Sequence, residues 1–140
     1  MLGLGATVIT NRREIAADDF FVGMYTTALD EGEIITAIRF PIPKRAAYMK
    51  FKQPASRFSL VGVFVAQFDA GVRVAVTGAS SCVFRHAGLE AALSGSFTPQ
   101  AAAVVIDASD LNADLHASAA YRANLISVQT QRAVAKMTGA

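Results

Sequence analysis

The sequence contains a single cysteine, Cys82, in 140 residues. One cysteine excludes a disulfide within the chain and any CxxC zinc or redox motif, and it fits a reducing compartment. The usual state of a lone buried cysteine is a packed thiol. We therefore predict a cytoplasmic protein without a redox-active dithiol.

The chain also lacks a large excess of charge and a long apolar run. Its 13 basic and 11 acidic residues leave a formal net charge of +2, which indicates no phosphate-binding stripe and no nucleic-acid partner. The longest apolar run, FSLVGVFVAQF (58–68), is shorter than the roughly 20 residues of a membrane helix. The opening MLGLGATVIT has no cationic lead and no cleavage-like end, so we expect neither a membrane span nor a signal peptide.

No complete catalytic or metal-binding motif is present. The GLG of residues 3–5 has neither a preceding strand nor the third glycine of a dinucleotide fingerprint. DLNAD (110–114) lacks the glycine and glutamate of a calcium loop. His86 and His116 have no cysteine or glutamate at ligand spacing, and we expect His116 to help organise the start of the last helix. The residues alone predict no catalytic and no metal-binding side chains.

The first third of the chain shows two short strand patterns. The first is ATVIT (6–10), and the second is EIITAIRF (33–40), which ends at Pro41 and Pro43. Between them, AADDFFVGMY (16–25) suits a brief helix or turn. PIPKRA (41–46) is the best candidate for a boundary between two structural units.

Three further strands follow this boundary. AYMKFKQ (47–53) alternates, with Met49 and Phe51 on one side and the lysines on the other, as in a half-buried strand. FSLVGVFVAQF is apolar on both faces and predicts a central strand. The turn residues DAG (69–71) connect it to VRVAVTGA (72–79), which completes an antiparallel meander.

Helical patterns occupy the last third. HAGLEAALSG (86–95) is of helix length, and Thr98 followed by Pro99 predicts a second helix over 100–109. A third helix begins after Ser118, where apolar residues recur at helical spacing. Strands first and helices later predict an α+β fold with the helices packed on one face of a small antiparallel sheet.

Four segments, taken together and in this order, resemble the FAD-binding medium subunit of the molybdenum hydroxylases, the carbon monoxide dehydrogenase and xanthine dehydrogenase group. They are GMYTTALDEGEIITAIRFPIP, FKQPASRFSLVGV, VRVAVTGA and DLHASAAYRANLISVQTQRAV. The resemblance implies that residues 1–42 are the last strands of a truncated FAD-binding domain and that residues 43–140 are the C-terminal domain of the subunit. The glycine-rich segments that hold the FAD pyrophosphate in this family have no counterpart here, so the chain looks like a fragment or a truncated gene product.

The resemblance further implies an oxidoreductase subunit whose FAD receives electrons from an iron–sulfur small subunit, which is supplied by a molybdenum cofactor large subunit. The resemblance also implies that two residues, Ile35 in GEIIT and Lys52 in FKQ, would lie near the isoalloxazine ring of FAD. Without the resemblance, Ile35 is interpreted as a core residue of a strand and Lys52 as a solvated side chain. We expect the chain by itself to retain no FAD and to be inactive. The alternative is a non-catalytic interaction or dimerisation module without flavin. The sequence leaves the oligomeric state open, with a homo-oligomer as one candidate.

Overall fold

The structure is a computed structural model that describes residues 1–139. Its elements, in chain order, are η1 (Leu2–Leu4), β1 (Thr7–Thr10), β2 (Glu14–Ala16), α1 (Ala17–Phe20), β3 (Phe21–Gly23), β4 (Thr26–Thr27), β5 (Ile35–Arg39), β6 (Arg45–Lys52), β7 (Ser59–Phe68), β8 (Gly71–Thr77), β9 (Phe84–Arg85), α2 (Ala87–Gly95), η2 (Gln100–Ala102) and α3 (Ala119–Thr138).

The larger sheet has the order β6-β7-β8-β9, and all its strand pairs are antiparallel. β7 is a central strand, as its two-sided apolar pattern predicts, and the valines at 61, 63 and 65 are fully buried. Gly62 on the opposite face lies against Tyr48, whose ring and hydroxyl occupy the place of a side chain. The predicted meander is therefore confirmed, with β9 as a fourth strand.

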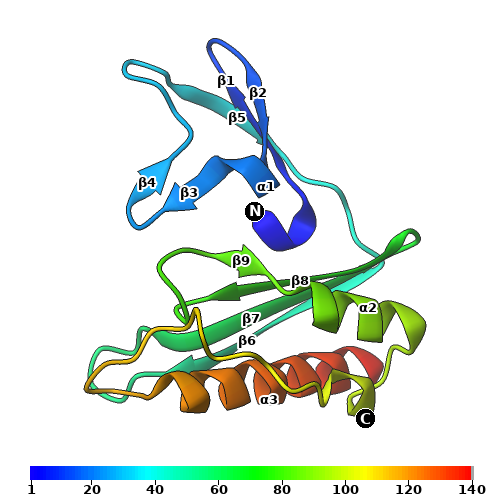
Figure 1. Cartoon of the computed structure of the whole chain (residues 1–140). Coiled ribbons are helices and arrows are strands. Elements are labelled where there is room, and N and C mark those ends of the chain that lie inside the picture. Colours follow the sequence, from blue (N-terminus) through cyan, green and yellow to red (C-terminus); the bar gives the residue numbers. More distant parts are fainter. Residues whose placement is uncertain (140) are drawn as a thin grey trace.

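Two helices cover one face of this sheet. The side chain of Ser118 caps α3 by accepting a hydrogen bond from the backbone N–H of Tyr121 at 3.2 Å, and His86 Nδ1 accepts from the N–H of Leu89 at 3.1 Å to cap α2. Leu89 and Ile126 meet the β7 and β8 valines in one buried cluster. Figure 1 shows α3 running along the sheet. The α+β fold predicted from the sequence is confirmed.

The predicted helix over residues 100–109 was wrong. Only one 3-10 turn, η2, forms there, and the chain then continues without regular structure to the start of α3. The N-cap of this turn is Pro99, one residue after the predicted Thr98, although the Thr98 hydroxyl accepts a hydrogen bond from the N–H of Ala101 at 3.3 Å. The β-branched residues 104–106 are poor helix formers, and the extended chain buries Ile106 in the main core.

The N-terminal part, residues 1–39, forms a smaller sheet of order β2-β1-β5 and the β3–β4 hairpin. The two predicted strands, β1 and β5, pair with each other in antiparallel fashion. The brief helix is α1, whereas β2, β3 and β4 are only two or three residues long and gave no pattern in the sequence. Val8, Ile15 and Phe20 form a small buried cluster in this part, and Leu2, Ala6 and Ala17 are buried as well.

Residues 40–44 connect the two sheets without regular structure, apart from a bend at Lys44. Lys44 pairs with Asp69, and its N–H donates to the Gln67 carbonyl at 2.8 Å, so the connection is fastened where β6 begins. The proposed boundary between residues 42 and 43 falls within this segment and stays a prediction.

A buried carboxylate, Glu33, closes the loop before β5. It accepts hydrogen bonds from the Arg13 guanidinium at 3.0 Å, from the N–H of Asp30 at 2.8 Å and from the hydroxyl of Thr10 at 2.7 Å. These donors, with Arg13 the strongest, lower the pKa of Glu33 from its ordinary 4.5 to about 2. The ionised carboxylate is therefore part of the folded structure.

We expect Glu33 to make the free energy of unfolding depend on pH in the acidic range. A carboxyl whose pKa is lowered by folding stabilises the folded state above its unfolded pKa, and this contribution disappears as the pH falls toward the folded pKa. In urea titrations from about pH 5 to about pH 3, the advantage of wild type over Glu33→Gln should shrink steadily. Glu31→Gln, at an exposed position, should follow wild type. A difference that is constant with pH would contradict the assigned protonation.

Candidate functional site

Lys52, the first candidate flavin-contacting residue, is the last residue of β6. The alternation of this strand leaves Tyr48, Lys50 and Lys52 exposed while Met49 and Phe51 are half-buried, as predicted. No ion pair involves Lys52 among residues 1–139. Its ammonium is therefore available to a negatively charged group.

The turn after Lys52 is held by its own backbone. The N–H of Gln53 donates to the Phe58 carbonyl at 2.8 Å, and the N–H of Arg57 donates to the Gln53 carbonyl at 2.9 Å. Arg57 adopts a left-handed conformation with φ of 62°, which is uncommon for a residue other than glycine. Arg57 thus shapes this turn.

Ile35, the second candidate, is the first residue of β5 and 39% exposed. It lies in the smaller sheet and Lys52 in the larger one (Figure 1). An exposed apolar side chain and an unpaired ammonium suit the ring face and the polar edge of an isoalloxazine, so the chemistry of both residues fits a flavin. Their assignment to one site remains a prediction.

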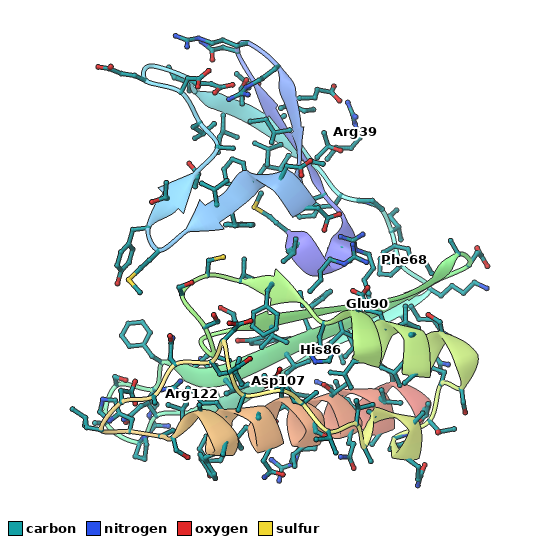
Figure 2. The ribbon with its side chains drawn as sticks, viewed as in Figure 1. Arg39, Phe68, His86, Glu90, Asp107 and Arg122 are labelled. Carbon is teal, nitrogen blue, oxygen red and sulfur yellow. The ribbon has the colours of Figure 1, made fainter. Side chains whose placement is uncertain are left out.

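A groove of about 620 Å³ lies between the N-terminal part and the larger sheet. Its walls are mostly apolar and include Leu4, Pro41, Phe68 and Ala91. Figure 2 shows Phe68 near the β7–β8 turn and Glu90 on α2, both below the N-terminal part. Neither Ile35 nor Lys52 lines this groove.

An ion-pair chain at this groove ties the two parts together. Arg73 on β8 donates to both carboxylate oxygens of Asp18 on α1, at 2.8 and 3.0 Å, and to the Leu2 carbonyl at 2.9 Å. Arg85 contacts the same Asp18 at 3.4 Å and forms a two-bond pair with Glu90 at 2.8 and 2.6 Å. The hydrogen bonds to Glu90 are the main reason why the pKa of Arg85 is raised. The network positions the N-terminal part over β8.

Sequence reasoning missed this network. One signal was available, because the alternation of VRVAVT places Arg73 on the face opposite Val72, Val74 and Val76, away from the helices. Its partner Asp18 precedes it by 55 residues, and no local pattern links residues at such a separation.

The loop that resembles a calcium site has a different role. Asp114 accepts hydrogen bonds from the N–H groups of His116 and Ala117, at 2.9 and 3.1 Å, and pairs with Arg122 at 2.7 Å. Asp114 thus organises the start of α3, whereas the ring of His116 contacts Gln53 at 2.6 Å. Across residues 1–139, no three His, Cys, Asp or Glu side chains are grouped to hold a metal ion.

Cys82 is partly buried, with its sulfur 3.3 Å from the Val83 carbonyl oxygen. In the part of the chain that the structure describes, none of the helices has the length and apolar character needed to cross a membrane.

Comparisons with known proteins agree with this fold. The chain is 34% identical over 137 residues to the nicotine 6-hydroxylase medium subunit of Paenarthrobacter nicotinovorans, covering 90% of this chain and 48% of the relative. It is 29% identical to the carbon monoxide dehydrogenase medium chain of Hydrogenophaga pseudoflava, covering 88% of this chain and 47% of the relative. No protein-family model matches the chain.

Among solved structures, the CO dehydrogenase of Oligotropha carboxidovorans superposes with a TM-score of 0.80 at 26% identity, over 96% of this chain and 53% of the other. The chain is therefore a relative of the medium subunits of the molybdenum hydroxylases. It spans about half the length of the relatives that it matches.

Proposed function

We propose that this chain supplies one part of an FAD-binding, electron-transferring medium subunit of a molybdenum hydroxylase, and that it acts in the cytoplasm. The observation that carries the proposal is the 34% identity to a hydroxylase medium subunit over 90% of the chain. The proposed partners are an iron–sulfur subunit and a molybdenum cofactor subunit. FAD, when bound, accepts electrons from the iron–sulfur clusters.

Within such a subunit, Lys52 and Ile35 have separate proposed roles. The Lys52 ammonium, unpaired and exposed at the end of β6, would lie at the polar edge of the flavin, where positive charge favours the negative charge gained on reduction. Ile35 would pack against the apolar ring. Lys50 is also exposed and lies in the same strand, so it serves as the matched control for Lys52.

The test is a chimera in which this chain replaces the matching half of the Hydrogenophaga pseudoflava medium chain. We expect the chimera to retain FAD through gel filtration and the chain alone to be colourless. Lys52→Met should lower the flavin midpoint potential, because a stabilising positive charge is lost. Lys50→Met should leave it unchanged, and neither variant should alter thermal stability because both side chains are exposed.

Equal flavin midpoint potentials in wild type and both variants would show that Lys52 is a solvated residue of β6 without a role at the flavin. A chimera that folds without flavin would favour the second proposed function, a non-catalytic interaction or dimerisation module. The observation that favours this alternative is the concentration of exposed apolar side chains near the start of the chain. Of the thirteen large ones among residues 1–139, six lie in the N-terminal part and two more, Phe40 and Ile42, in the connection that follows it.

A further inference from the structure

The groove between the N-terminal part and the larger sheet has the size and the lining of a small-molecule site. Its volume of about 620 Å³ falls within the roughly 300–1,000 Å³ of typical ligand pockets, which are mostly apolar and contain a few polar groups. The apolar lining of this groove comes from both parts of the molecule and includes Leu4, Pro41, Phe68, Val72 and Ala91. Its charged lining consists of Arg73, Arg85 and Glu90.

Two of these charged side chains neutralise each other. Arg85 donates to both carboxylate oxygens of Glu90, at 2.8 and 2.6 Å, and Glu90 Oε1 also accepts the N–H of Val74 at 2.9 Å. Arg73 is then the remaining charge of the lining, because its partner Asp18 does not line the groove. The lining therefore carries one more positive than negative charge.

Arg73 has donors that the fold does not use. Its hydrogen bonds to Asp18 and to the Leu2 carbonyl are all donated by one nitrogen, Nη2. Among residues 1–139, Nη1 makes no hydrogen bond, and Nε is buried without an acceptor. A guanidinium has five N–H donors, and a buried donor without an acceptor is unfavourable. Arg73 can therefore hold Asp18 and a second anionic group at the same time.

Gly5 keeps one side of this guanidinium uncovered. Gly5 lines the groove and has a left-handed conformation, with φ of 63°. A Cβ atom there would lie 3.2 Å from Cζ of Arg73 and 3.4 Å from its Nη1. A side chain at this position would cover the guanidinium, whereas glycine leaves it open to a group that enters the groove.

We propose that this groove binds a small carboxylic acid with an apolar body. The carboxylate accepts a hydrogen bond from Nη1 of Arg73, and the body lies on the apolar walls at Phe68 and Ala91. The positive lining favours a carboxylate over a neutral or cationic group, and a guanidinium forms strong charge-assisted hydrogen bonds with carboxylates. The proposal does not depend on flavin binding, because neither Ile35 nor Lys52 lines the groove.

The test titrates the chain at neutral pH with decanoate, decanol and butyrate, and follows binding by calorimetry and by NMR of the arginine Nε–H groups. Decanoate should bind one molecule per chain, at least about tenfold more tightly than decanol, because only decanoate can accept a charge-assisted hydrogen bond. Butyrate has the charge but a smaller apolar body, so it should bind at least about tenfold more weakly than decanoate. The Nε–H resonance of Arg73, assigned by its loss in Arg73→Gln, should shift with decanoate and not with decanol.

Two variants test the two halves of the site. Arg73→Gln should remove the preference for decanoate over decanol. Ala91→Leu, at an exposed position of α2, should weaken the binding of both molecules at least about tenfold, because leucine occupies part of the groove. The matched control is Ala120→Leu, which is exposed in α3 and lies outside the groove lining, and it should bind as wild type does.

Thermal unfolding of each variant alone separates a binding defect from a folding defect. If Arg73→Gln does not fold, the comparison of decanoate with decanol on the wild-type chain still tests the carboxylate, and Ala91→Leu still tests the location. No saturable binding of decanoate, equal affinities for decanoate and decanol, or binding that Ala91→Leu leaves unchanged would each overturn the proposal. Flavin is absent from every sample, so these outcomes leave the flavin proposal to its own test.

Discussion

Arg122→Met is expected to lower the free energy of unfolding by about 3 kcal/mol, since it leaves one buried acceptor and two part-buried ones without their donor, and an unsatisfied buried acceptor costs about 1–3 kcal/mol. The Arg122 side chain is 4% exposed. Its guanidinium donates to the carbonyl oxygens of Leu60 and Gly78, at 2.8 and 3.0 Å, and to Asp114 at 2.7 Å. One side chain therefore joins β7, the end of β8 and the loop before α3.

The matched control is Arg132→Met in the same helix. Arg132 is exposed, so its replacement should change stability by no more than about 0.5 kcal/mol. Chemical denaturation of the two variants and wild type gives the comparison. Equal losses in both variants would show that the hydrogen bonds of Arg122 contribute no more than its helix position does.

Gly78→Ala should destabilise the protein by at least about 2 kcal/mol, because a left-handed conformation strains any side chain and a steric overlap adds to that strain. Gly78 follows β8 with φ of 79°. A Cβ atom there would overlap the carbonyl oxygen of Ser59 and lie 3.1 Å from that of Leu60. Both carbonyls belong to the central strand β7, which cannot move without disturbing its neighbours on both sides.

Gly95→Ala is the opposite case and the control. Gly95 is the last residue of α2, and a Cβ there meets no atom within 4 Å. Alanine is favoured over glycine in a helix by about 0.5–1 kcal/mol, so this variant should be slightly more stable than wild type. If Gly95→Ala proved as destabilising as Gly78→Ala, the loss could not be assigned to the strain and overlap at Gly78.

The elements that could be predicted are those in which the pattern of apolar and polar residues within one segment shows which side chains are buried. The two-sided apolar pattern of residues 58–68 matches β7, and the alternation of residues 47–53 matches β6, because a strand exposes alternate side chains to different surroundings. The helical spacing of the apolar residues after Ser118 matches α3, because one side of this helix packs on the sheet. The shortest strands, β2, β3 and β4, are too short to produce a period.

The candidate site was predictable only in its parts. The resemblance drew attention to Ile35 and Lys52, and the strand period correctly predicted the exposure of Lys52. It did not reveal that Ile35 lies in an edge strand of the smaller sheet, because that depends on the pairing of β5 with β1. The wrong prediction of a helix over residues 100–109 also reflects a long-range contact, because the burial of Ile106 in the main core competes with local helix formation.

By itself, then, the sequence determined the fold class, the central strand, the helices α2 and α3 and the family, all of which follow from local periodicity and the order of matched segments. Only the tertiary structure decided which distant charges meet, as in Asp18 with Arg73 and Arg85, how Arg122 joins three elements, and where the smaller sheet is left open at β5. These features depend on contacts between residues far apart in the chain. Packing and strand register determine such contacts, and a local sequence pattern does not predict them.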